Sequence, residues 1–187
     1  MEEQSYWWYV LYVRTNTERK AIADTQKAFE QKGLPYRLEA FCPETEKYYR
    51  KKELQEAGRR YLKRPLFPGY VFIETDMPSR EFLKVFSDYI YNSQYIIRVL
   101  RYGDSKEIAL SREERERFEY LFKGKRCVEH SVGYIVGDAI TVTGGPLVGM
   151  EGCIKRINRH NRTAEIEIDM FNQKQTIVVA LEIVSKS

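Results

Sequence analysis

Cysteine is scarce in this chain of 187 residues, and long apolar runs are absent from it. The three cysteines, Cys42, Cys127 and Cys153, lie too far apart to be paired metal ligands, and their odd number argues against a disulfide framework. We interpret them as reduced, structural thiols. No apolar run approaches the roughly 20 residues that a membrane span needs, and the acidic, polar start at residues 1–4 is unlike a secretory signal. These absences predict a cytoplasmic protein that does not enter a membrane.

Histidine is equally rare, and catalytic motifs are missing. The two histidines, His130 and His160, stand alone, with no GxSxG, HExxH, P-loop or Cys–His arrangement around them. A lone histidine in a basic loop is more often a polar contact than a catalyst. The sequence therefore predicts that the protein is not an enzyme and has neither a metal site nor a cofactor.

The composition is that of a folded and mildly basic protein. Hydrophobic residues make up 43% of the chain and aromatic residues 13%, which is enough for one ordinary core or two small ones. Charged residues make up 31%, with a net charge of +4. This charge suits contact with a polyanion, although it is modest for a dedicated nucleic-acid binder.

The first two thirds of the chain predict strands alternating with helices. Residues 6–13 are apolar throughout, as in a central strand. Thr15 and Glu18 have capping-box spacing and predict the start of a helix that Gly33 and Pro35 end. The further expected elements are a strand at 37–42, a central strand from 70, a short helix after 78, a strand at 96–102 and a helix capped by Ser111 and Glu114. This order predicts an α+β domain of ferredoxin-like type.

Two prolines and a glycine stand immediately before the central strand, in the stretch 65–73. Pro68 cannot donate a ladder hydrogen bond, and Gly69 leaves no side chain over the neighbouring backbone. Two interpretations of this strand start remain open. Phe67 and Tyr70 are either ordinary core residues or part of a shallow surface on which another chain docks.

Residues 44–64 are basic and rich in tyrosine, which predicts a long β-hairpin or a mobile loop. Tyr48, Tyr49 and Tyr61 are interleaved with lysine and arginine. That combination can pair with phosphates and stack on bases. A solvated loop without a ligand is the equally weighted alternative.

The pattern changes after a polar stretch at 123–131, which we interpret as a linker. Short β-branched runs then alternate with turn residues such as those at 144–146 and 158–161. About fifty residues of closely spaced strands predict a small antiparallel β-barrel.

Two stretches resemble a known family. Residues 137–152 (GDAITVTGGPLVGMEG) resemble the KOW motif, a small-barrel signature of transcription factors and some ribosomal proteins. Residues 8–12 (WYVLY), the helix after them and residues 67–72 (FPGYVF) resemble the NusG N-terminal (NGN) domain. Residues 66–68 (LFP) after Pro65, and Leu11 and Tyr12 after Trp8 and Tyr9, resemble the specialised paralogs typified by RfaH and LoaP. The basic, tyrosine-rich insert and the basic turn of the KOW domain favour the LoaP branch.

The resemblance implies a fold and a domain order. We expect a ferredoxin-like NGN domain at 1–122, a linker at 123–131 and an SH3-like KOW β-barrel at 132–187. It also implies a monomeric, non-enzymatic factor that binds bacterial RNA polymerase and suppresses pausing and termination.

The resemblance also implies roles for particular residues. An aromatic depression that grips the clamp helices of the largest polymerase subunit is expected at Tyr12, Phe67, Pro68, Gly69 and Tyr70. Basic positions on the same face are expected to meet the non-template DNA of the transcription bubble, and these are Arg14, Lys20 and Arg101.

The barrel departs from the housekeeping pattern at a basic turn. Arginine can pair bidentately with phosphate or guanine, and asparagine can bond an adenine edge. We therefore expect the turn, with the linker, to bind a hairpin in the nascent RNA. The residues expected to do so are Lys123, Lys125, Arg126, Lys155, Arg156, Asn158, Arg159, His160, Asn161, Arg162 and Lys174.

Three alternatives stay open. The turn is either an RNA-binding element or a solvated hairpin. The protein is either an operon-specific antiterminator or a general elongation factor that couples polymerase to the ribosome, through a ribosomal protein, or to a termination factor. A ribosome-associated KOW protein is the third alternative, although it would not need the aromatic strand start at Phe67 and Tyr70.

Overall fold

The computed structural model describes residues 6–48 and 61–184, and the chain divides into two compact units. Unit 1 joins Met1–Cys42 with Phe67–Arg115, and unit 2 joins Pro43–Leu66 with Glu116–Ser187. Both units are therefore built from segments that are far apart in sequence.

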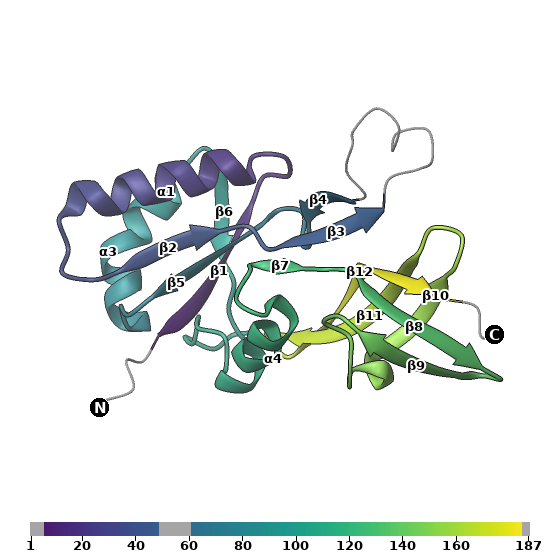
Figure 1. Cartoon of the computed structure of the whole chain (residues 1–187). Coiled ribbons are helices and arrows are strands. Elements are labelled where there is room, and N and C mark those ends of the chain that lie inside the picture. The colour runs from purple at the N-terminus through teal and green to yellow at the C-terminus, as the bar shows by residue number, and fades with distance from the viewer. Residues whose placement is uncertain (1–5, 49–60, 185–187) are drawn as a thin grey trace. The chain divides into compact units, whose positions relative to one another are not determined.

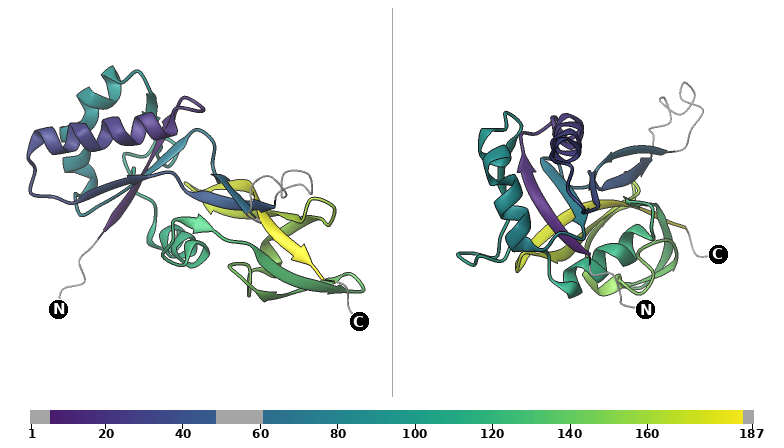
Figure 2. Two further views of the ribbon diagram at one scale, coloured as in Figure 1. Left: turned by 45° about the horizontal axis from the view of Figure 1, so that its top comes forward. Right: turned by 90° about the vertical axis from the view of Figure 1, so that its left-hand side faces the viewer.

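Unit 1 is a four-stranded antiparallel sheet with two helices on one face (Figures 1 and 2). The strand order is β2-β5-β1-β6, which places the apolar first strand and the predicted central strand in the middle. The strands are β1 (Trp7–Val13), β2 (Leu38–Phe41), β5 (Tyr70–Thr75) and β6 (Ile96–Val99), and the helices are α1 (Glu18–Lys32) and α3 (Ser79–Asn92). The predicted ferredoxin-like α+β class is confirmed.

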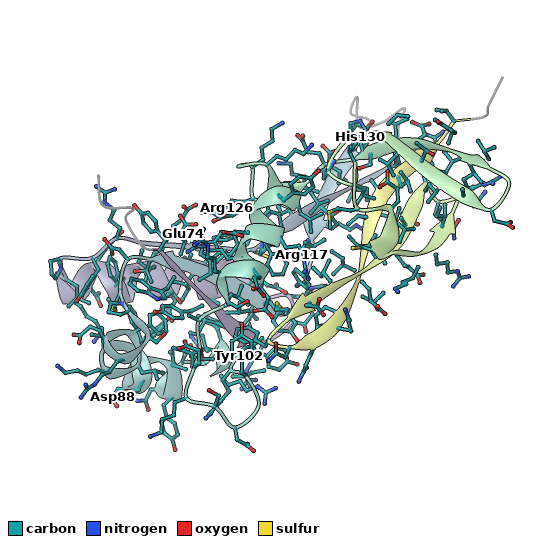
Figure 3. The ribbon with its side chains drawn as sticks, turned by 90° about the horizontal axis from the view of Figure 1, so that it is seen from below. Glu74, Asp88, Tyr102, Arg117, Arg126 and His130 are labelled. Carbon is teal, nitrogen blue, oxygen red and sulfur yellow. The ribbon has the colours of Figure 1, made fainter. Side chains whose placement is uncertain are left out.

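Alternation along β1 builds a core on each face of this sheet. Tyr9 points to the helices, where its ring lies 4.2 Å from that of Phe82 and its hydroxyl donates to the Met77 carbonyl at 2.6 Å. Burial raises the pKa of Tyr9 well above its usual range, so it stays a neutral donor. Trp8 points to the other face and donates from Nε1 at 2.7 Å to the carboxylate of Glu74, which is labelled in Figure 3.

The two predicted capping boxes had different outcomes. The box at helix α4 (Arg112–Phe122) is confirmed, because Ser111 Oγ accepts from the Glu114 amide and Glu114 accepts from the Ser111 amide, both at 3.2 Å. The box at Thr15 is wrong. Helix α1 begins only at Glu18, after the N-cap Thr17, which makes no side-chain cap hydrogen bond.

Unit 2 contains a five-stranded half-barrel with the order β10-β11-β12-β8-β9. Its strands are β8 (Ser131–Val136), β9 (Ala139–Gly144), β10 (Ile154–Asn158), β11 (Thr163–Met170) and β12 (Gln173–Ile183), with the 3-10 turn η1 (Glu151–Cys153) before β10. Every second residue of β11 is buried, from Ala164 to Met170. The predicted KOW-type fold is confirmed, although one strand pair, β12 with β8, is parallel.

A second sheet of unit 2 has the order β4-β3-β7. The antiparallel pair β3 (Glu44–Tyr48) and β4 (Tyr61–Pro65) is the base of the predicted hairpin. Strand β7 (Cys127–Val128) lies inside the stretch interpreted as a linker and pairs with β3 in parallel. Tyr49 and the other insert residues at 49–60 lie outside the described residues. The predicted domain limits stay a prediction, but the described residues 43–48 and 61–66 belong to unit 2.

Candidate functional site

The stretch Phe67–Tyr70 forms a tight turn at one end of the unit 1 sheet. The Tyr70 amide donates to the Phe67 carbonyl at 3.1 Å, which closes the turn. Pro68 and Gly69 occupy its two central positions, and Gly69 has a φ of 84°. This is the residue pattern of a type II turn, in which the third residue requires a positive φ.

Gly69 is enclosed by the backbone around it. A Cβ at this position would lie 3.3 Å from the Val13 carbonyl oxygen and 3.4 Å from the Tyr12 ring. The Gly69 carbonyl accepts from the Val13 amide at 2.7 Å, so the turn is fastened to the end of β1. The prolines and the glycine therefore define a fixed strand start.

A buried carboxylate completes this fastening. Glu18 is 7% exposed, and its Oε1 accepts from the Gly69 amide at 2.7 Å and from the Asn16 amide at 3.3 Å. Sequence reasoning assigned Glu18 to a helix cap and missed this contact, which spans 51 positions along the chain. Because a charged acceptor strengthens a hydrogen bond, Glu18 holds the turn firmly.

Two tyrosines flank the turn on neighbouring strands. Tyr12 pairs with Tyr70 across β1 and β5, and their ring centroids lie 5.4 Å apart. Both are half-buried, while Pro68 is exposed. The Arg98 guanidinium lies 5.8 Å from the Tyr12 ring centroid, in a cation–π contact that the sequence did not indicate.

Phe67 lies deeper than its neighbours. It is 5% exposed, and its ring lies 5.9 Å from that of Phe72 and 6.2 Å from that of Tyr70. The structure thus brings all five predicted residues together, with Tyr12, Pro68 and Tyr70 at the surface and Phe67 beneath. Their binding role stays a prediction.

The three residues predicted to meet DNA are exposed but do not form one group. Arg14 directly follows β1, and Lys20 lies in the first turn of α1. Arg101 follows Leu100, whose amide donates to the Val10 carbonyl. Because β1 and β6 are antiparallel and Leu11 pairs with Val99, Arg101 lies about five residues, or roughly 17 Å, from Arg14 along the sheet.

The predicted RNA-binding residues of unit 2 differ in their surroundings. Those on the barrel strands and their turn include four that are paired with carboxylates: Lys155 with Glu167 at 3.3 Å, Arg156 with Glu165 at 3.8 Å, Arg162 with Glu182 at 3.7 Å and Lys174 with Asp169 at 2.9 Å. Asp169 also binds Arg117 of α4 at 2.8 Å (Figure 3). Surface pairs of this kind contribute only about 0–1 kcal/mol, so a phosphate can compete for the cation.

Among the predicted RNA-binding residues, those at the tip of the turn between β10 and β11 have the fewest contacts with carboxylates of the described residues. Asn158 Oδ1 accepts from the Asn161 amide at 2.9 Å, and Arg162 adopts a φ of 51°, which shapes the turn. Arg159 and His160 are exposed, and no side-chain partner among the described residues holds either of them. These two side chains and the Asn161 side chain are presented to solvent.

Each basic residue of the predicted linker makes a hydrogen bond or an ion pair within unit 2. Lys123 Nζ donates to the Gly145 carbonyl at 3.2 Å, and Lys125 pairs with Glu129 at 2.8 Å. Arg126 adopts a φ of 54°, and its carbonyl accepts from the Glu44 amide at 3.0 Å.

Within the described ranges, no group of three or more His, Cys, Asp or Glu side chains could hold a metal ion. The helices in the same ranges also include none that is long and apolar enough to cross a membrane.

A ferredoxin-like sheet with helices on one face and a small half-barrel define a protein of the NGN–KOW class. Comparisons with known proteins agree. The family model described as "Transcription termination factor nusG" matches residues 6–119. The chain belongs to the NusG family.

Relatives cover the chain almost end to end. The transcription termination/antitermination protein NusG of Thermus thermophilus is 25% identical over 91% of this chain and 92% of its own length. The protein of the same name from Deinococcus radiodurans is 24% identical over 96% and 98%. A solved structure titled "Domain interaction in Thermotoga maritima NusG" is similar with a TM-score of 0.50, at 21% identity over 94% of both chains.

Proposed function

We propose that this NusG-family transcription factor is an elongation and antitermination factor that binds bacterial RNA polymerase through unit 1. The surface consists of Tyr12, Phe67, Pro68, Gly69 and Tyr70, and it docks on the clamp helices of the largest subunit. Binding there disfavours opening of the polymerase and so suppresses pausing and termination. The protein acts by binding, without a chemical step of its own.

The observation that carries this proposal is the turn fastened by Glu18. A docking surface gains affinity when its parts are ordered before the partner arrives. Here the Gly69 amide and carbonyl are both bonded, at 2.7 Å each, to Glu18 and Val13. Tyrosines on a fixed support are typical interface hot spots.

We further propose that unit 2 recruits the factor to particular transcripts by binding an RNA hairpin. The exposed Arg159, His160 and Asn161 at the tip support this role, because no carboxylate among the described residues pairs with Arg159 or His160. The alternative is a general elongation factor that binds polymerase without its own RNA signal. The relatives favour that alternative, because they carry the name transcription termination/antitermination protein NusG and not that of a specialised paralog.

Polymerase binding is tested with the full chain and purified core polymerase. Tyr70→Ala is expected to weaken binding by at least about thirtyfold, since a hot-spot side chain contributes about 2 kcal/mol or more. Tyr91→Ala is the matched control, because Tyr91 is a tyrosine that is 89% exposed on α3 and is not one of the five residues of the proposed surface. Equal affinities of the two variants would sink the proposal.

RNA recruitment is tested separately with hairpins from upstream leader regions over a salt series. Arg156, Arg159 and Arg162 are replaced together by alanine, and the affinity is expected to fall with a shallower dependence on salt. The charge-matched control replaces Lys27, Lys32 and Lys84, which are exposed in unit 1. An unchanged affinity in the arginine variant would favour the general elongation factor.

A further inference from the structure

A cluster of planar side chains surrounds Tyr48 in unit 2. The Tyr48 ring, 8% exposed, lies 4.7 Å from the ring of Tyr61 and 5.0 Å from the guanidinium of Arg162. The centroid of the His130 imidazole lies 6.3 Å from that of the Tyr48 ring. Tyr61 and His130 are themselves stacked, with centroids 4.4 Å apart and planes at 14°.

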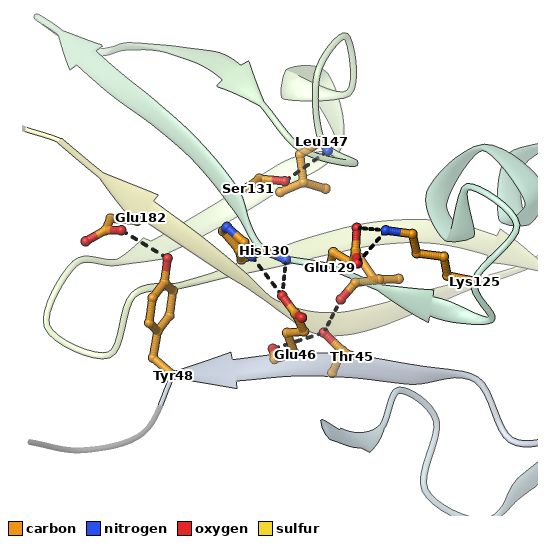
Figure 4. Close-up of polar contacts among 10 residues, drawn as sticks. Thr45, Glu46, Tyr48, Lys125, Glu129, His130, Ser131, Leu147 and Glu182 are labelled. Carbon is orange, nitrogen blue, oxygen red and sulfur yellow. Dashed lines mark hydrogen bonds and ion pairs between the residues drawn. The ribbon is translucent and has the colours of Figure 1, made fainter. Parts of the chain in front are cut away.

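Two carboxylates fix the cluster from within (Figure 4). The Tyr48 hydroxyl donates to Glu182 Oε2 at 3.0 Å, and burial with this hydrogen bonding keeps the pKa of Tyr48 well above its usual range. Glu46 Oε2 lies 2.8 Å from both the amide and Nδ1 of His130. The acidic groups are thus engaged inside the cluster, Glu182 with Tyr48 and Arg162, and Glu46 with His130.

The outer members of the cluster remain open to solvent. The side chains of His130 and Arg162 are 38% and 49% exposed, and Tyr61 is half-buried. Glu46, by contrast, is only 15% exposed. The side chain of Glu182 is 34% exposed, so solvent meets the aromatic and guanidinium groups together with part of this one carboxylate.

This cluster adjoins the basic turn of the barrel. Arg162 is the last residue of that turn, and its carbonyl accepts from the Leu181 amide on β12 at 3.0 Å. Its side chain reaches Tyr48 of β3, more than a hundred positions earlier in the chain. The hairpin base and the turn with Arg159 and His160 are therefore neighbours in one unit.

We propose that Tyr61, His130 and Arg162 form a stacking surface for unpaired RNA bases, beside the turn that holds the phosphates. The inference rests on the proposed RNA binding by unit 2 and adds the class of RNA: a hairpin with a single-stranded flank. Aromatic rings and guanidinium planes accept any base, and stacking contributes about 1–3 kcal/mol per base. Duplex RNA hides its base edges in a narrow groove, so unpaired flanks are where such groups can act.

A purely structural role would make a different prediction. If the cluster only fastened the β3–β4 hairpin to the barrel, its loss would affect all RNAs alike or none. A stacking surface, by contrast, affects only RNAs that bring unpaired bases.

The test uses the full chain and two labelled probes: a blunt leader hairpin, and the same hairpin with a tail of about six uridines. Tyr61→Ala is expected to weaken binding of the tailed probe about tenfold and to leave the blunt probe within about twofold. Tyr61→Phe, which keeps the ring, is expected to bind both probes like the original protein. Equal effects of Tyr61→Ala on the two probes would overturn the proposal.

A crosslinking measurement covers the case in which Tyr61→Ala fails to fold. A 5-iodouridine tail irradiated on the unaltered protein is expected to crosslink at Tyr61 or His130, as located by mass spectrometry. Crosslinks confined to other segments would overturn the stacking surface.

The variant Arg159→Ala distinguishes failure of the stacking surface from failure of the proposed RNA binding by unit 2. If it weakens both probes while Tyr61→Ala weakens neither, RNA binding stands and only the stacking fails. If Arg159→Ala changes neither probe, the proposed RNA recruitment itself fails.

Discussion

Replacing Glu18 by alanine removes the carboxylate that joins α1 to the turn before β5. This carboxylate accepts a hydrogen bond from the Gly69 amide at 2.7 Å. Because Gly69 is buried, no water readily replaces the lost acceptor. A hydrogen bond to a charged group contributes about 1.5–3 kcal/mol. The carboxylate also lies in the first turn of α1, where a negative charge adds about 0.3–1 kcal/mol.

We expect Glu18→Ala to lower the unfolding free energy of unit 1 by about 2–3 kcal/mol. Glu18→Gln retains an acceptor oxygen but loses the charge, and it is expected to cost about 1 kcal/mol. The assay is urea unfolding followed by tryptophan fluorescence. Both tryptophans of the chain, Trp7 and Trp8, lie in β1, so the signal reports on unit 1 alone.

The control is Glu30→Ala, an exposed carboxylate on the same helix. It is expected to change stability by less than about 0.5 kcal/mol. The reasoning is refuted if Glu18→Ala is no more destabilising than Glu30→Ala. It is also refuted if alanine and glutamine at position 18 give the same loss, since the acceptor would then be irrelevant.

Three further outcomes follow from the contacts described above. Gly69→Ala forces a side chain into a positive φ and against the Val13 carbonyl, so unit 1 should lose about 1–2 kcal/mol in the same urea assay; an unchanged midpoint would contradict this. Burial raises the pKa of the Cys127 thiol to about 11, so at pH 8 iodoacetamide should modify it more slowly than the other two cysteines, as counted by mass spectrometry. Hydrogen bonds from Lys174 and then Arg117 lower the pKa of Asp169 below its usual 3.8. The stabilisation from Asp169 is therefore complete above that value and is lost as the pH falls through the lower, folded-state pKa. Lys174→Ala should raise the Asp169 pKa in an NMR titration, and an unmoved pKa would rule the pair out as its cause.

Local signals in the sequence predicted the elements that depend on local interactions. Ser111 and Glu114 satisfy each other within one helical turn, and their spacing was sufficient to predict the start of α4. The same spacing at Thr15 and Glu18 was misleading, because a tertiary partner takes the carboxylate. Gly69 competes for it from another strand, and spacing along the chain carries no information about such a partner.

The same limit explains what was missed in unit 2. Cys127 and Val128 stand among polar residues, and two apolar positions are too few to show a period. They form β7 because β3 offers an edge with which to pair. The residue types of the candidate site were visible in the sequence, as with the prolines, glycine and tyrosines of the turn. The placement of Arg98 over Tyr12 and of Arg162 over Tyr48 required the fold.

The parallel pairing of β3 with β7, and the hydrogen bond of Tyr48 to Glu182, have a consequence for synthesis on the ribosome. Tyr48 and Glu182 are 134 positions apart, so β3 emerges long before its partner on β12 exists. Synthesis proceeds at roughly 5–20 residues per second. The strands β3 and β4 are therefore synthesised on the order of ten seconds before the β12 strand that contacts Tyr48. Contacts so distant in sequence also form slowly. Unit 2 is thus completed only once β12 has left the ribosome, whereas every segment of unit 1 has by then been available for seconds.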